Sequence, residues 1–132
     1  MVAYSFQKRF VPPILGGVKD QTIRGERRRH ARPGEELQLF TGMRTRHCKL
    51  VARRPCVAVL SMVMMLGSGL IVVDNRRVDD LDAFARRDGF RDFDDMSTFW
   101  DADVRCRMWS AWLIRWEPIA PDFPLADMER ST

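Results

Sequence analysis

The sequence has few of the residues from which disulfide frameworks and metal centres are built. Its 132 residues include three cysteines and two histidines. Cys48, Cys56 and Cys106 cannot all pair and show no C-x-x-C spacing, so neither a disulfide framework nor a structural zinc site has support. His30 and His47 are too few for a histidine-based centre. We therefore expect reduced thiols, no metal and no other cofactor.

Long apolar runs are also missing. The longest, CVAVLSMVMML at residues 56–66, is shorter than the ~20 residues that span a bilayer. The first residues, MVAYSFQKRF, lack the basic-then-apolar layout of a secretory signal. These features predict a soluble, cytoplasmic protein without a membrane partner. An apolar share of 45% is enough for one packed core, so we expect one domain.

Acidic residues are scarce in the first part of the chain. Residues 1–54 carry thirteen Lys and Arg against four Asp and Glu, whereas residues 55–132 carry nine against fourteen. A net charge of +4 therefore conceals a strongly basic first half. This polarity suits a polyanionic partner, nucleic acid above all. The alternative is a set of scattered solvated charges, because charge alone does not define a site.

Local patterns indicate short strands and helices. SFQKRFVPPILGG (5–17) predicts a short helix that is broken by two prolines and ends at the glycine pair. DQTIR (20–24) predicts a strand in which Ile23 faces the core, while Thr22 and Arg24 face outward or into a cleft. Further strands are expected at PGEELQLF, RHCKLVAR, PCVAVLSMVMM, LIVVD and AWLIRW.

Two helices are expected between the last two strands. VDDLDAFARRDGF (78–90) has Asp79 or Asp80 as its N-cap and Gly89 as its stop, and DFDDMSTFWDAD (92–103) repeats this logic. Together the elements predict an α+β fold, a small β-barrel of five or six strands with two or three short helices. The domain is expected to cover residues 1–117, followed by an extended tail at residues 118–132.

The motif GVKDQTIR (17–24) is followed by a basic loop and a Pro-Gly-Glu turn into a strand. This arrangement resembles the ASCH domain, a PUA-like β-barrel whose signature is G-x-K-x-x-x-x-R. The later FARRDGF and the final LIRW strand look like the C-terminal half of the same family. The resemblance covers about residues 6–116 and implies a PUA-like barrel.

The resemblance also implies functions. ASCH domains are generally regarded as RNA-binding or RNA-associated modules, and a few have been described as ribonucleases. One enzyme branch consists of amidohydrolases that remove the acetyl group from N4-acetylcytidine with a lysine, a threonine and an acidic residue. The matching positions here are Lys19, Thr22 and Asp88. The enzyme branch typically has glutamate at the third position, so the carboxyl of Asp88 is one methylene shorter.

The chemistry of these three residues is plausible, but each also has an ordinary structural explanation. A threonine hydroxyl needs an adjacent base, which a lysine of depressed pKa can supply. A carboxylate in the last turn of a helix is disfavoured, which raises its pKa toward that of a proton donor. Alternatively, Lys19 is solvated, Thr22 is present for its β-propensity and Asp88 pairs with Arg86 or Arg87 at the surface.

Cationic residues near the motif are candidates for nucleic-acid contacts. They are Lys19, Arg24, Arg27, Arg28, Arg29, Arg32, Arg44 and Arg46. For Arg24 the alternative is a guanidinium that bridges strands or carboxylates, and for the others it is a solvated loop. Of the tryptophans that could stack bases, Trp112 and Trp116 are expected in the core and Trp109 nearer the surface.

Two functions of different class follow. The leading hypothesis is an RNA- or nucleotide-binding module with a basic cleft. The alternative is an amidohydrolase acting on an N4-acylated cytidine or a related nucleoside, with Thr22 as nucleophile, Lys19 as base and Asp88 as acid. A third possibility is an inert protein with a degenerate site. A catalyst needs the lysine amine and the threonine hydroxyl within hydrogen-bonding reach, so we expect these groups and Arg24 to share one cleft.

Overall fold

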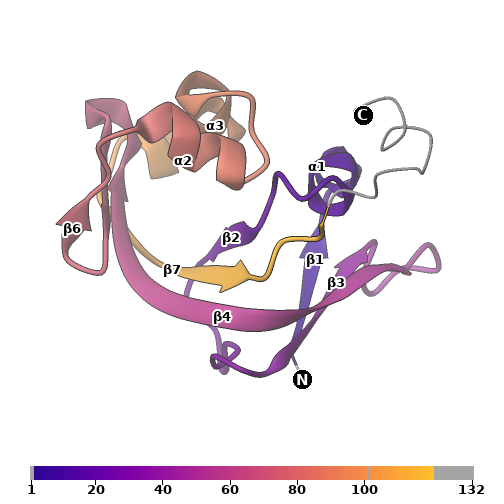
Figure 1. The fold of residues 1–132 in the computed structure, drawn as a ribbon. Coiled ribbons are helices and arrows are strands. Elements are labelled where there is room, and N and C mark those ends of the chain that lie inside the picture. Colours follow the sequence, from indigo (N-terminus) through magenta and orange to yellow (C-terminus); the bar gives the residue numbers. More distant parts are fainter. Residues whose placement is uncertain (1, 101, 121–132) are drawn as a thin grey trace, which may run out of the picture.

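The computed structural model describes residues 2–100 and 102–120 and has an α+β fold (Figure 1). In this part of the chain seven strands form one sheet. The strands are β1 (Val2–Phe6), β2 (Gln21–Arg24), β3 (Glu36–Thr41), β4 (Lys49–Met65), β5 (Leu70–Val73), β6 (Arg76–Arg77) and β7 (Trp109–Trp116). The helices are η1 (Lys8–Phe10), α1 (Val11–Leu15), η2 (Leu66–Ser68), α2 (Leu81–Arg87), α3 (Phe93–Phe99) and α4 (Ala102–Arg105).

The long strand β4 organises the sheet. Its first part pairs antiparallel with β3 up to Pro55, and its second part pairs antiparallel with β7 from Cys56 and with β5 from Met62. A register shift between Cys56 and Ala58 marks the change of partner. Irregularities of this kind bend a strand, and Figure 1 shows β4 curving beneath the molecule from β3 to β5. One bent strand thus replaces the two strands expected at RHCKLVAR and PCVAVLSMVMM.

No backbone hydrogen bonds pair strand β1 with strand β2. β1 pairs in parallel with β3, and β2 pairs antiparallel with β7. Side chains join the two strands instead, since Arg24 Nη2 donates to the carbonyl of Ser5 at 2.7 Å and Arg27 Nη1 donates to the carbonyl of Ala3 at 3.3 Å. The sheet is therefore open at this β1–β2 seam, and the expected barrel is not confirmed.

The N-terminal segment differs from its expectation. A helix was expected around Phe6, but Val2, Tyr4 and Phe6 are the buried positions of β1, and the helical turns begin at Lys8. The two prolines lie in the first turn of α1, where a helix needs no backbone donor. β1 and β6 bring the number of strands to seven where five or six were expected.

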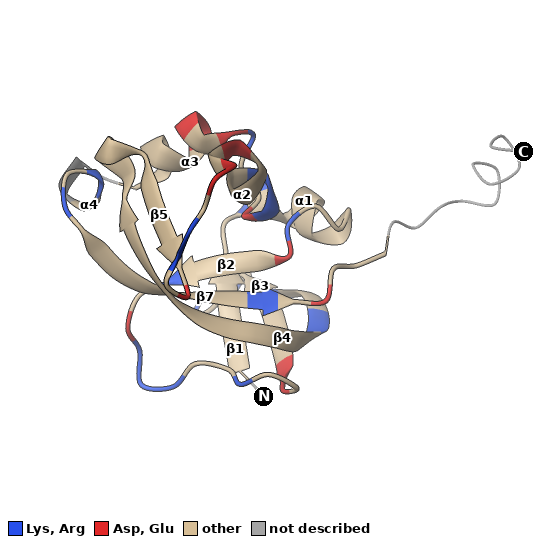
Figure 2. Cartoon of the chain, turned by 60° about the vertical axis from the view of Figure 1, so that its left-hand side comes forward, with Lys and Arg blue, Asp and Glu red and all other residues tan. Residues whose placement is uncertain are grey.

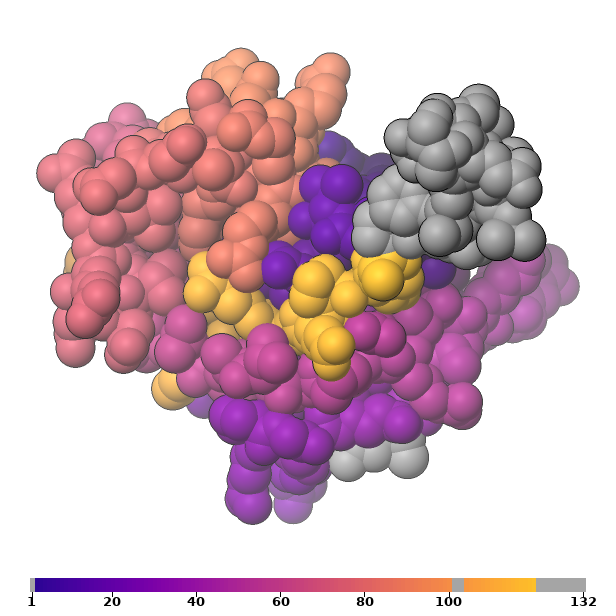
Figure 3. Space-filling view, in the orientation of Figure 1, coloured from indigo at the N-terminus to yellow at the C-terminus, as the bar shows by residue number. Residues whose placement is uncertain are grey.

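The helices α2 and α3 lie together on one side of the bent sheet (Figure 1). Their expected caps are present: the side chains of Asp80 and Asp92 accept hydrogen bonds from Ala83 N and Asp95 N. Phe84, Ala85 and Met96 bury the inner faces of the two helices. The space-filling view in Figure 3 shows β4 and the end of β7 crossing below these helices.

Within residues 2–100 and 102–120, no helix combines the length and apolar character needed to cross a membrane. The same residues contain no group of three or more His, Cys, Asp or Glu side chains arranged to hold a metal ion. Of the expected tail, residues 118–120 are described and 121–132 lie outside the described residues.

Candidate functional site

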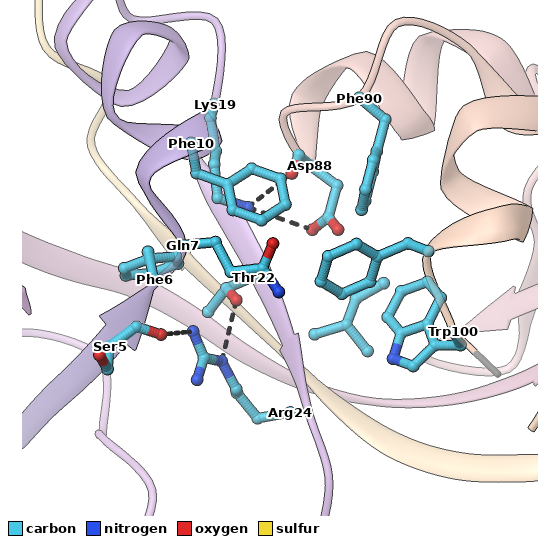
Figure 4. A pocket seen from close by; sticks show the side chains of 12 residues that line it. Ser5, Phe6, Gln7, Phe10, Lys19, Thr22, Arg24, Asp88, Phe90 and Trp100 are labelled. Carbon is cyan, nitrogen blue, oxygen red and sulfur yellow. Dashed lines mark hydrogen bonds and ion pairs between the residues drawn. The ribbon is translucent and has the colours of Figure 1, made fainter. Parts of the chain in front are cut away.

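A pocket of about 220 Å³ lies where the β1–β2 seam meets the ends of α2 and α3 (Figure 4). It brings together the four residues expected to share a cleft. Its lining consists of Ser5, Phe6, Gln7, Phe10, Lys19, Thr22, Ile23, Arg24, Asp88, Phe90, Phe99 and Trp100. The charged members and Thr22 come from the segment between α1 and the end of β2 and from the end of α2, whereas Ser5 and Gln7 come from β1 and the residue after it.

Lys19 is buried, with 2% of its surface exposed, which excludes a solvated lysine. Its ammonium donates to the carbonyls of Gln21 at 2.7 Å and Asp88 at 2.6 Å. The Phe10 ring lies 4.7 Å from Nζ. Burial lowers the pKa of Lys19 to about 8, against the opposing effect of the Asp88 carboxylate. The two carbonyl acceptors favour the protonated amine.

Asp88 caps the C-terminus of α2 and is also buried. Its Oδ1 lies 3.8 Å from Lys19 Nζ and has no hydrogen-bond partner among the described residues. Burial raises the pKa of Asp88 to about 6, although Lys19 and then Arg24 act in the opposite direction. Surface pairing with Arg86 or Arg87 is excluded, because Asp88 is 4% exposed and its ion pair is with Lys19. Arg87 pairs with Asp20 instead, at 2.8 Å.

Thr22 and Arg24 project from the same face of β2, as their spacing predicts. Thr22 is 4% exposed, and its Oγ1 accepts a hydrogen bond from Arg24 Nε at 3.0 Å. Arg24 stacks 4.8 Å from the Phe6 ring centroid and bonds to β1. Lys19 Nζ makes its two recorded hydrogen bonds to carbonyls, neither of them to Thr22. The lysine–threonine contact that a catalyst needs is therefore not formed in this state.

Aromatic rings form the opposite wall of the pocket, a feature that the sequence reasoning missed. The centroids of Phe10 and Phe90 are 5.4 Å apart, those of Phe90 and Phe99 5.2 Å, and those of Phe99 and Trp100 5.1 Å. Phe99 and Trp100 are apolar positions of the second expected helix, at residues 92–103. Nothing in that local pattern distinguishes a ring that lines a pocket from one that fills the core.

The basic residues expected to bind nucleic acid fall into two groups. Arg27, Arg28 and Arg44 line a second pocket together with Arg24. Arg29 forms an ion pair with Glu35, and Arg32 and Arg46 are exposed and line neither pocket. In Figure 2 the loop that follows β2 carries blue stretches, whereas red residues gather on α2 and α3.

The loop is anchored by a histidine whose role had not been expected. His30 Nε2 lies 2.9 Å from the Gly25 carbonyl and so donates to it, which leaves Nδ1 to accept from the Tyr4 hydroxyl at 2.9 Å. The Tyr4 oxygen also accepts from Ala31 N at 3.3 Å. Burial lowers the pKa of His30, consistent with a neutral ring.

Two tryptophans differ from their expected positions. Trp116 is buried as expected, but Trp112 is only partly buried and donates to Glu26 Oε2 at 3.0 Å. Trp109 is also partly buried and packs 5.7 Å from Trp100. Strict alternation fails because both faces of β7 are covered in part: the neighbours Leu113 and Ile114, which point to opposite faces, are both buried.

Comparisons with family models, with curated proteins and with solved structures found no match for the chain.

Proposed function

We propose that the chain is an ASCH-type, PUA-like module that binds a nucleobase, as part of a nucleotide or of RNA, in the pocket at the β1–β2 seam. The observation that carries the proposal is the pairing of an aromatic wall with a polar wall in one pocket. Nucleobases have this dual character, because they combine a π face with a hydrogen-bonding edge.

The size and chemistry of the pocket support the binding of a nucleobase. Its volume of about 220 Å³ lies below the ~300–1,000 Å³ typical of drug-sized ligands. One side offers the rings of Phe90 and Phe99 for stacking, and the other offers the Thr22 hydroxyl and the Asp88 carboxylate. A base donating to the unpartnered Asp88 oxygen would offset part of the cost of burying that carboxylate.

Amide hydrolysis of an N4-acylated cytidine or a related nucleoside is the second candidate. Lys19 and Asp88 favour this reaction, because their pKa values of about 8 and about 6 lie near neutrality. Both residues line the same pocket as Thr22. For this chemistry the fraction of Lys19 that is neutral would have to turn toward Thr22.

The reaction would then run in two stages. Thr22 Oγ attacks the acyl carbon as its proton passes to the Lys19 amine, and the C–N bond breaks as protonated Asp88 gives its proton to the leaving amine. Water then hydrolyses the threonine ester, releasing the carboxylic acid. Because the amine of Lys19 is held by two carbonyls, we rank binding ahead of this reaction.

Binding and turnover can be measured on the same samples. We expect calorimetry with the four common nucleosides, their 5′-monophosphates and N4-acetylcytidine to detect binding by at least one compound. Thr22→Val should weaken that binding several-fold, by removing a hydroxyl worth about 1 kcal/mol. The matched Thr98→Val, at an exposed position of α3, should not. NMR detection of acetate tests the second candidate.

The possible outcomes separate the hypotheses. Binding that depends on Thr22, without acetate release, supports the module. Acetate release that is abolished by Thr22→Val establishes the amidohydrolase instead. If no compound binds, or if Thr22→Val and wild type bind equally, the proposed base pocket is wrong.

A further inference from the structure

A second pocket adjoins the first along the β1–β2 seam. Its volume is about 460 Å³, and Ser5 and Arg24 line both pockets. Its lining consists of Ala3, Tyr4, Ser5, Arg24, Arg27, Arg28, Met43 and Arg44. Four guanidinium groups therefore converge on a pocket whose described lining contains no carboxylate.

The positive charge of this second pocket is uncompensated within the part of the chain described. Arg27, Arg28 and Arg44 form no ion pair with a described residue, in contrast to Arg29 and its partner Glu35. The carboxylate nearest in sequence, that of Glu26, forms no ion pair with these arginines and does not line the second pocket. It accepts a hydrogen bond from Trp112 and lines a different pocket, beside Arg27 and Arg28. Gathering like charges without acids costs free energy, which a bound anion would recover.

The guanidinium groups of Arg24 and Arg27 are positioned rather than merely solvated. Arg24 is held by Thr22 and Ser5, as described above. Arg27 stacks 4.9 Å from the Tyr4 ring centroid and bonds to Ala3. Arg44 has a φ of 66°, a left-handed conformation that non-glycine residues rarely adopt. Two of the cations thus contact the free edge of β1, beside the proposed base pocket.

We propose that this second pocket binds the phosphate of the nucleotide whose base occupies the first pocket. This inference rests on the proposed function and names its ligand class, a nucleotide unit rather than a free nucleoside. Arg24, which lines both pockets, would then lie between the base and its phosphate. Of the basic residues of the first half, only Arg24, Arg27, Arg28 and Arg44 would contact the phosphate.

Two triple variants of equal charge test the proposal. One is Arg27→Ala/Arg28→Ala/Arg44→Ala, and its matched control is Arg29→Ala/Arg32→Ala/Arg46→Ala. The probe is a fluorescein-labelled single-stranded RNA containing all four bases, followed by fluorescence anisotropy between about 50 and 200 mM salt. Unlabelled nucleosides and their 5′-monophosphates serve as competitors. Urea unfolding confirms that both variants remain folded.

We expect the first triple variant to weaken RNA binding about tenfold or more. It should reduce the log–log salt slope by about 0.7, the contribution of one phosphate contact on a single strand. The control should change affinity less than about threefold, as its residues contribute only long-range attraction. Monophosphates should compete better than nucleosides in wild type but not in the first triple variant. Lysine in place of the three arginines should restore most of the affinity.

The proposal is wrong if the two triple variants weaken RNA binding equally. It is also wrong if nucleosides and monophosphates compete equally well, or if the wild-type protein does not bind RNA. Failure of the proposed base pocket gives a different result. In that case Thr22→Val leaves RNA affinity unchanged, while the first triple variant still differs from its control.

Discussion

At the scale of the residue, the most consequential feature is the buried pair of Lys19 and Asp88. Taking two charges out of water costs several kcal/mol per ion, and mutual attraction offsets this only with additional hydrogen bonds. Lys19 has such bonds in the carbonyls of Gln21 and Asp88, whereas Asp88 Oδ1 has no partner among the described residues. The carboxylate is therefore the less satisfied member and the one most easily protonated.

This imbalance predicts a pH dependence of stability. Burial raises the pKa of Asp88 from its ordinary value of 3.8 to about 6. Between about pH 4 and pH 6 the folded protein therefore retains a proton that the unfolded chain has released. Fewer protons on the unfolded chain mean that stability falls as pH rises. Relative to Asp88→Asn, the wild-type free energy of unfolding should fall by on the order of 2–3 kcal/mol across this range.

Urea unfolding of both proteins at several pH values measures this difference. Subtracting the Asp88→Asn values removes the contribution of the other carboxylates, which are shared by the two proteins. A difference that stays constant between pH 4 and pH 6 would mean that Asp88 titrates equally in the folded and unfolded states. Lys19 does not interfere, because its pKa of about 8 leaves it protonated in this range.

At the scale of the element, the end of α2 determines where Asp88 lies. The helix ends at Arg87 with Asp88 as its cap, and the next residue is Gly89, whose φ of +94° is readily adopted only by glycine. A Cβ at this position would lie 2.8 Å from both Lys19 Cδ and Phe10 Cδ1. The absence of a side chain therefore allows the helix end to approach the site closely.

Gly34 supplies a matched comparison. It has a similar φ of +91°, but a Cβ there would meet no atom within 4 Å. Gly34→Ala should cost about 1–3 kcal/mol from backbone strain alone. Gly89→Ala should cost about 1–3 kcal/mol more, because Lys19 and Phe10 must move. Urea unfolding provides the measurement, and equal losses for the two variants would contradict the close packing of α2 on the site.

At the scale of the whole molecule, the β1–β2 seam separates two pairs of strands, β1 with β3 and β2 with β7. Arg24 crosses this seam with a hydrogen bond to Ser5 while it contacts the Phe6 ring. The same side chain also lines both pockets. Arg24 thus links the stability of the seam to the ligand binding that we propose.

Replacing Arg24 by methionine should therefore destabilise the fold. Hydrogen bonds to a charged group contribute about 1.5–3 kcal/mol, and Arg24→Met should cost about that amount and increase hydrogen exchange in β1. The exposed Arg27, whose bond to Ala3 is longer at 3.3 Å, provides the control, and Arg27→Met should cost less than about 1 kcal/mol. Equal effects of the two substitutions would show that Arg24 does not hold the seam together.

Local sequence determined several parts of the fold and site. The two-residue period of a strand placed Thr22 and Arg24 on one face of β2. An aspartate N-cap and a glycine stop predicted α2 with Asp88 at its end, as the structure has it. These features depend on interactions within a few residues, which the order of amino acids alone specifies.

Other features depended on the tertiary structure. The segment at residues 2–6 is a strand because β3, more than 30 residues away, offers it a parallel edge, and β4 is one strand because it can bend where it changes partner. The carbonyl of Asp88 reaches Lys19 across 69 positions of sequence. That Arg27, Arg28 and Arg44 line the second pocket and Arg29 does not likewise depends on how the loop packs against β1. Such contacts are decided by the path of the whole chain, because their free energy is gained only when distant segments pack together.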